Sequence, residues 1–243
     1  MEPTRIGVIG AGLMGAHFLA IARQHPVCLP IGVADVLSDR AQSLADRYGV
    51  RSYSDYRNLL DDPDLDAVVI ATGESFHLEP ALYAAAAGKH MLIEKPLATS
   101  SMDGEKMIAA AAQSGVLLMV AHALRFDPNY GRARQAVRSG TLGDLVHVNA
   151  RRNTSMGDAA RLAGRTSITY YLGSHSVDTL QWVMNSPICE VTTISVQKAL
   201  RHLGVDDTVL SLLRFQSGAI GALENSWIRP DGAANRKIGS SLV

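Results

Sequence analysis

The sequence has few cysteines, no excess of charge of either sign and no long hydrophobic run. Cys28 and Cys189 are its two cysteines, far apart in 243 residues, which argues against a disulfide framework and predicts two reduced core residues. Lys and Arg number 23, as do Asp and Glu, so nothing points to a nucleic-acid or membrane partner. A membrane-spanning helix needs about 20 consecutive apolar residues, and no apolar run in the sequence approaches that length. A composition of 47% hydrophobic and 19% charged residues indicates a globular protein.

The apolar stretch from Ile6 to Ala22 is not a signal peptide by its pattern. One basic residue, Arg5, precedes it, and glycines interrupt any continuous hydrophobic core. We therefore expect a cytoplasmic protein.

The first half of the chain alternates strand-like and helix-like segments. Strands are expected at 5–9, 28–34, 66–71, 89–93 and 116–121. Helices are expected at 13–24, 38–48 with Ser38 as the cap, 76–87 ending at Gly88, and from the Thr99–Ser101 cap to Gly115. Strand, helix and strand in repetition predict a Rossmann α/β domain with a doubly wound parallel sheet, over residues 1–122.

After residue 122 the pattern changes. Helices are expected at 128–139 and 173–185, and strands at 144–152, 190–200, 208–215 and 219–227. These elements predict an α+β domain with a largely antiparallel sheet over residues 123–243. Leu242-Val243 ends in what resembles the start of another strand, so we expect this domain to be incomplete.

Residues Gly10 to Gly15 form G-x-G-x-x-G between a predicted strand and a predicted helix. Gly10 allows the tight turn, Gly12 lets the backbone approach a pyrophosphate, and Gly15 allows close helix–strand packing. The N–H groups at the helix start, where Leu13 and Met14 lie, would face the phosphates. A glycine-rich turn without a ligand is the less favoured alternative.

Asp35 ends the second predicted strand, 20 residues beyond Gly15. A carboxylate there can accept hydrogen bonds from a ribose and would repel a 2′-phosphate, which favours NAD over NADP. Arg40 lies close enough to keep NADP open, and Asp35 could instead cap the following helix.

Glu94-Lys95-Pro96 follows the predicted strand at 89–93, where open α/β sheets bind ligands. Pro96 lacks an N–H and turns the chain out of the sheet, so Glu94 and Lys95 are candidates to contact the cofactor. Thr72 and His77 follow the neighbouring strand and are candidates for the nicotinamide end. A surface histidine behind a helix cap at Ser75 is an equally weighted alternative for His77.

His175 and Asp178 lie three residues apart on one face of the predicted helix at 173–185. Histidine suits proton transfer near neutral pH, although a structural His–Asp pair is the ordinary explanation. The spacing of His147, His175 and His202 matches no ligand motif, so no metal site is predicted.

Together these residues resemble the Gfo/Idh/MocA family of NAD(P)-dependent oxidoreductases, which act mainly on sugars and cyclitols. The resemblance runs from Ile6 to about Trp227 and is most specific in GKHMLIEKPLA, residues 88–98. It implies that Lys95 touches the reacting hydroxyl and the nicotinamide region, and that His175 is the acid/base. It also makes Arg125 and Asp178 candidates for substrate binding.

The chain departs from the family pattern D-x-G-x-H-x-x-D at its first position, where Tyr171 stands. Tyr171 is therefore a candidate to bind substrate or to act with Lys95 as a proton relay. The resemblance further implies an oligomer formed through the second-domain sheet. Two alternatives stay open, a non-catalytic dinucleotide-binding protein and a relative that cleaves glycosides with NAD.

Overall fold

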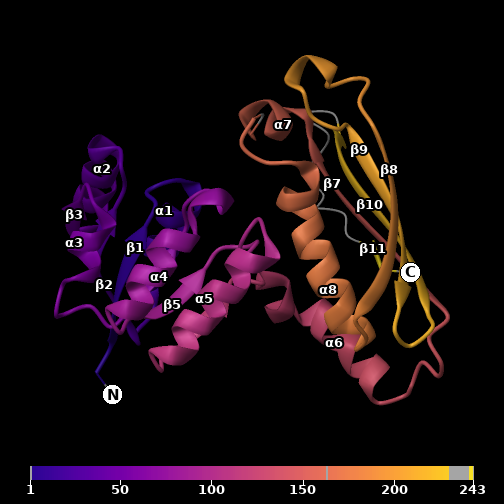
Figure 1. Cartoon of the computed structure of the whole chain (residues 1–243), viewed down its shortest axis with the longest axis horizontal. Coiled ribbons are helices and arrows are strands. Elements are labelled where there is room, and N and C mark those ends of the chain that lie inside the picture. The colour runs from indigo at the N-terminus through magenta and orange to yellow at the C-terminus, as the bar shows by residue number, and fades with distance from the viewer. Residues whose placement is uncertain (1, 163, 230–240, 243) are drawn as a thin grey trace. The chain divides into compact units, whose positions relative to one another are not determined.

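The chain forms two compact units, Met1–Ala121 and His122–Val243, each built on its own sheet (Figure 1). This computed structural model describes residues 2–162, 164–229 and 241–242.

The first unit contains a six-stranded parallel sheet in the order β3-β2-β1-β4-β5-β6. Its strands are β1 Thr4–Ile9, β2 Cys28–Ala34, β3 Arg51–Tyr53, β4 Ala67–Ile70, β5 His90–Ile93 and β6 Leu118–Val120. The order reverses between β1 and β4, which is the point where doubly wound sheets bind their ligands. The prediction of a Rossmann domain is confirmed.

Helices cover both faces of this sheet (Figure 1). On one face lie α1 Leu13–Gln24 and α2 Ser38–Tyr48, and on the other lie α3 Tyr56–Leu60, α4 Leu78–Ala86 and α5 Ser101–Gln113. Leu19 and Leu44 pack the first face, whereas α4 packs the second through small buried alanines such as Ala81 and Ala84. Burial on both sides explains why β4 is continuously apolar.

Some local expectations for this unit were wrong. Ser38 is the first residue of α2, and Leu37 occupies the N-cap position without a side-chain hydrogen bond. The helix expected at 76–87 is a short 3₁₀ turn, Glu74–Phe76, followed by α4. Strand β3 and helix α3 were not anticipated, because elements of three and five residues are too short to show a period.

The second unit contains a five-stranded sheet in the order β11-β7-β10-β9-β8. Its strands are β7 His147–Ser155, β8 Ile188–Val196, β9 Thr208–Phe215, β10 Ile220–Arg229 and β11 Ser241–Leu242. β7 and β10 are parallel, and the three other pairs are antiparallel. The prediction of an α+β unit with a largely antiparallel sheet is confirmed.

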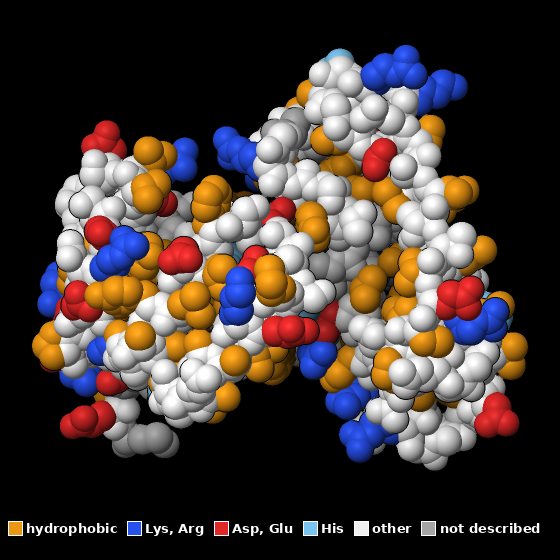
Figure 2. Space-filling view, viewed as in Figure 1, with side chains coloured by type: hydrophobic (Ala, Val, Ile, Leu, Met, Phe, Trp, Pro, Cys, Tyr) orange, Lys and Arg blue, Asp and Glu red, His pale blue; other side chains and the backbone are white. Residues whose placement is uncertain are grey.

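One face of this second sheet is covered, and the other carries exposed apolar side chains. α8 Ser174–Met184 packs on the covered face through Leu180, and α6 Pro128–Arg138 packs on α8. A further helix, α7 Met156–Leu162, follows β7. Hydrophobic side chains project along the side of the unit where β8 lies (Figure 2). Among the described residues, the apolar side chains exposed here include Ile194, Leu210 and Leu212.

The two cysteines differ in their exposure. Cys28 is half-buried, but Cys189 is exposed, so the prediction of two core cysteines was wrong for Cys189. Within the described ranges, no helix is both long and apolar enough to cross a membrane.

Candidate functional site

The glycine turn after β1 is tightly packed at two of its glycines and open at the third. Gly10 has a φ of +100°, and a Cβ there would lie 2.7 Å from the Ala71 carbonyl oxygen. A Cβ on Gly15 would lie 1.8 Å from the Gly10 carbonyl oxygen, whereas a Cβ on Gly12 would meet nothing within 4 Å. The fold therefore requires Gly10 and Gly15, and Gly12 leaves room for a ligand to approach the backbone.

The start of α1 presents backbone donors beside this turn. Gly12 is the N-cap and has no side chain to satisfy the first N–H groups, and the first turn carries no acidic residue. Leu13 and Met14 are exposed there. These donors and the positive end of the helix dipole fit the pyrophosphate of a dinucleotide.

Asp35 connects the end of β2 to the glycine turn. Its Oδ2 accepts a hydrogen bond from the Ala11 N–H at 2.8 Å, and its Oδ1 accepts from the Leu37 N–H at 2.9 Å. A carboxylate has about four acceptor positions, so capacity remains for ribose hydroxyl groups. Arg40 lies exposed in the first turn of α2.

His77 is a buried residue that joins two loops at the same edge of the sheet. Its Nδ1 lies 3.1 Å from the Pro96 carbonyl oxygen and 3.2 Å from that of Leu97. Its Nε2 lies 3.3 Å from the carbonyl oxygen of Thr72, whose hydroxyl donates to the Phe76 carbonyl. The alternative of a surface histidine was wrong, because the residue is only 1% exposed.

The loop after β5 carries the half-buried Glu94 and Lys95. The Lys95–Pro96 peptide is cis, and the Lys95 N–H donates to Glu94 Oε2 at 3.1 Å. Burial raises the pKa of the Glu94 carboxyl, and the positive charge of Lys95 partly opposes that rise. Strands β1, β4 and β5 are parallel neighbours. The loops that carry Gly10, Thr72 and Lys95 therefore lie side by side at the carboxyl ends of these strands.

In the second unit, Asp178 forms an ion pair with Arg125. Arg125 Nε donates to Asp178 Oδ2 at 3.0 Å and Nη2 donates to Oδ1 at 2.5 Å, and this bond raises the pKa of the guanidinium. His122 Nδ1 lies 3.5 Å from the same carboxylate. The two predicted substrate ligands therefore compensate each other's charge. His122 was not anticipated, because its pairing depends on a residue 56 positions away.

His175 lies in the first turn of α8, half-buried and one turn before Asp178. A single π-helical turn, Thr169–Gly173, leads into this helix. Such turns recur at functional sites because they shift the side-chain positions of the adjoining helix.

Tyr171, in this π-helical turn, stacks on the buried ring of Trp227. Their ring centroids are 5.2 Å apart and the planes are inclined by 19°. Arg161 of α7 hydrogen-bonds to Asp158, which is the main reason that the pKa of the guanidinium is raised, and Tyr171 contributes to the same rise. Aromatic packing thus orients the residue that replaces the expected aspartate.

Both halves of the chain match known family profiles. Residues 4–122 match the oxidoreductase family with an NAD-binding Rossmann fold, and residues 130–238 match the GFO/IDH/MocA C-terminal domain. The chain belongs to the GFO/IDH/MocA oxidoreductase family.

Its relatives in this family include dehydrogenases and reductases. Myo-inositol 2-dehydrogenase of Thermotoga maritima is 30% identical over 229 residues, which cover 91% of this chain and 68% of that protein. The 1,5-anhydro-D-fructose reductase of Ensifer adhaerens is 29% identical, over 92% and 69% of the two chains. A Lactobacillus casei scyllo-inositol dehydrogenase structure with NAD(H) and scyllo-inositol shares the fold, at 21% identity. Its TM-score is 0.88 over 100% of this chain and 76% of that one.

Family membership confirms three predictions made from the sequence. The chain is an oxidoreductase, its class is that of dehydrogenases and reductases acting on CH–OH groups, and its cofactor is NAD. The roles of the individual site residues stay predictions.

Proposed function

We propose that this chain is an NAD-dependent dehydrogenase of a sugar, cyclitol or similar polyol. Residues 1–122 would bind the cofactor, and residues 123–243 would supply residues that line the substrate site. The observation that carries the proposal is that Lys95 leaves β5 at the sheet edge that also bears the open glycine turn. The names of the inositol and anhydrofructose relatives support the substrate class.

Lys95 and His175 would have separate roles in the oxidation of the alcohol. Bound NAD⁺ supplies the acceptor for the hydride that leaves the carbinol carbon. The Lys95 ammonium donates a hydrogen bond to the reacting oxygen and stabilises its developing negative charge. His175 accepts the hydroxyl proton, so the carbinol loses a hydride and a proton and becomes a carbonyl. Proton transfer of this kind contributes about 10²- to 10⁴-fold in rate.

Other side chains would orient the two ligands. Asp35 would accept hydrogen bonds from the adenosine ribose, and Glu94 would accept from the cofactor beside Lys95. Tyr171 would meet the substrate with its phenol edge, because stacking on Trp227 fixes its ring. The Arg125–Asp178 pair would present a neutral polar surface suited to hydroxyl groups.

The open face of the second sheet would bind a second copy of the chain. Ile194, Leu210 and Leu212 are between 45% and 69% exposed on neighbouring strands, around a groove of about 580 Å³. An exposed apolar surface of this kind is stabilised when a copy covers it. Sedimentation of Leu212→Glu should show a smaller assembly than that of the unmodified protein.

The proposal is tested by a nicotinamide fluorescence titration followed by a screen of polyols for NADH production. We expect NADH to form with at least one inositol or sugar. Lys95→Ala and His175→Ala should each keep the affinity for NADH and lower turnover at least about a hundredfold. Near-normal turnover in either variant would contradict the assigned roles.

Tyr171 favours a second candidate, a dinucleotide-binding protein without catalysis, because a phenol replaces the carboxylate of the family pattern. Binding of NADH without turnover of any polyol would support this candidate. Analysis of products from glycosides would detect NAD-dependent glycoside cleavage.

A further inference from the structure

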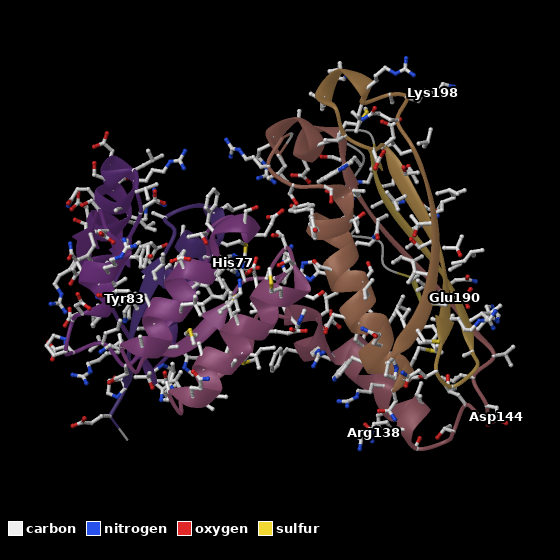
Figure 3. The ribbon with its side chains drawn as sticks, viewed as in Figure 1. His77, Tyr83, Arg138, Asp144, Glu190 and Lys198 are labelled. Carbon is white, nitrogen blue, oxygen red and sulfur yellow. The ribbon has the colours of Figure 1, made fainter. Side chains whose placement is uncertain are left out.

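His77 contacts the backbone that immediately follows Lys95. The ring lies inside the first unit, where α4 begins (Figure 3). Its Nδ1 faces the Pro96 and Leu97 carbonyl oxygens at 3.1 and 3.2 Å, one and two residues after Lys95. The ring therefore contacts the outgoing side of the Lys95 loop through backbone carbonyl oxygens.

We propose that His77 is a positioning residue, whose Nδ1–H donates to the carbonyl oxygens of the Lys95 loop while Nε2 lies against the Thr72 carbonyl. This inference rests on the proposed role of Lys95. His77 acts through the backbone and needs no contact with cofactor or substrate.

Leu97 and Ala98 pack against the core of the first unit, so burial holds the far end of the loop and the ring holds the part next to Lys95. Pro96 has no N–H to donate, and the N–H of Lys95 donates to the side chain of its neighbour Glu94. A buried carbonyl oxygen that loses its donor costs about 1 to 3 kcal/mol. Removal of the Nδ1 donor would therefore favour a rearrangement of the Pro96 and Leu97 carbonyls, and Lys95 would move with them.

The two ring nitrogens contact different loops, so different substitutions can remove one contact and keep the other. The amide nitrogen of asparagine reaches the position of histidine Nδ1, and that of glutamine reaches the position of Nε2. His77→Asn therefore keeps a donor for Pro96 and Leu97 but loses the Thr72 contact. His77→Gln keeps the Thr72 contact and loses the donor to the Lys95 loop.

A purely structural role predicts a different outcome. If His77 only filled space beneath α4, both substitutions would remove volume, and any loss of turnover would follow the loss of thermal stability. A positioning role predicts that turnover follows the Nδ1 donor and not stability.

The deciding experiment compares amide hydrogen exchange of residues 94–98 and steady-state kinetics in the unmodified protein, His77→Asn and His77→Gln. All samples carry saturating NAD⁺, and the kinetic assay uses myo-inositol or the polyol turned over fastest. We expect His77→Gln to exchange faster in this loop and to lose about ten- to a hundredfold in kcat, with KM for NAD⁺ within about threefold. His77→Asn should keep slow exchange and at least about a third of kcat.

His90 provides the matched control. It lies at the opposite end of β5, where its Nδ1 accepts a hydrogen bond from the Leu117 N–H at 3.0 Å. His90→Asn should leave exchange of residues 94–98 and kcat within about twofold of the unmodified protein.

Equal losses in His77→Asn and His77→Gln that follow their melting temperatures would overturn the inference, as would unchanged exchange in both. If the unmodified protein turns over no polyol, the proposed function fails. The exchange data alone then decide whether His77 holds the loop.

Discussion

The two units build their candidate sites from different material. In the first unit, backbone groups dominate: the open turn at Gly12, the N–H groups that begin α1, and the carbonyl oxygens around His77. In the second, side chains pair with one another, as Asp178 does with Arg125 and Tyr171 with Trp227. A backbone site requires glycine at defined positions, whereas a side-chain site requires tertiary partners. Substitutions should therefore have different consequences in the two units.

The largest effect is expected at the most crowded backbone position. In Gly15→Ala the new methyl group would overlap the Gly10 carbonyl oxygen, since the ideal Cβ position is 1.8 Å from it. The variant should lose about 3 kcal/mol of stability or fail to fold. Urea unfolding measures the loss, and a variant as stable as the original would show that the turn tolerates a Cβ at this position.

A buried carboxylate of the second unit gives the next effect. Asp207 accepts hydrogen bonds from the N–H groups of Lys198, Ala199 and Leu200 at 2.8, 2.6 and 2.7 Å. Asp207→Ala leaves these donors without the carboxylate and should cost about 2 to 3 kcal/mol at pH 7.

The pH dependence of this cost has a definite sign. Burial acts to raise the pKa of Asp207, but the three N–H groups lower it further, so the folded pKa lies below the ordinary value of 3.8. The stabilisation is therefore present above that value and is lost as the pH falls through the folded pKa. In urea unfolding, the difference between the two proteins should narrow below about pH 4. A difference that grows in acid would contradict this account.

Gly12→Ala tests the open position of the same turn, in contrast to the crowded position of Gly15. Because its Cβ would meet no protein atom within 4 Å, the free energy of unfolding should change by less than about 1 kcal/mol. The methyl group would instead occupy the approach of the pyrophosphate and weaken NADH binding about tenfold or more. Fluorescence titration gives the affinity, and binding as tight as in the unmodified protein would contradict the assigned path of the cofactor.

The smallest effect is expected away from both sites. Asp66 accepts hydrogen bonds from the Arg5 N–H, Nε and Nη2 at the amino-terminal ends of β1 and β4. Chiefly through the Arg5 side chain, these bonds lower its pKa from 3.8 to about 2. Because the pair is more than a third exposed, Asp66→Asn should cost only about 1 kcal/mol at pH 7.

This stabilisation is present above pH 3.8 and is lost as the pH falls through about 2. Thermal unfolding at pH 7 and pH 2 checks both the size and the sign. A larger cost in acid than at neutral pH would be inconsistent with the pair.

The backbone site of the first unit could be predicted from the sequence because the residues that form it are close together in the chain. Gly10, Gly12 and Gly15 lie in one hexapeptide, and the edge at which Lys95 lies follows from the strand–helix alternation. Local pattern also placed α1 and β9 at their observed bounds.

The side-chain site of the second unit could be predicted from the sequence only in part. His175 was located by its motif, but the pairing of Asp178 with Arg125 and His122 joins residues more than 50 positions apart. Tyr171 and Trp227, whose rings stack, are likewise more than 50 positions apart, in the π-helical turn and in β10. Such contacts arise from tertiary packing, which a local pattern does not encode.

The central claim is that the first unit binds NAD and the second supplies the acid/base through His175. The most direct test is chemical rescue of His175→Ala by imidazole, with the polyol that the unmodified protein turns over fastest. We expect unchanged NADH affinity, a loss of at least about a hundredfold in turnover, and a rate that rises with added imidazole. Near-normal turnover of His175→Ala without imidazole would contradict the account.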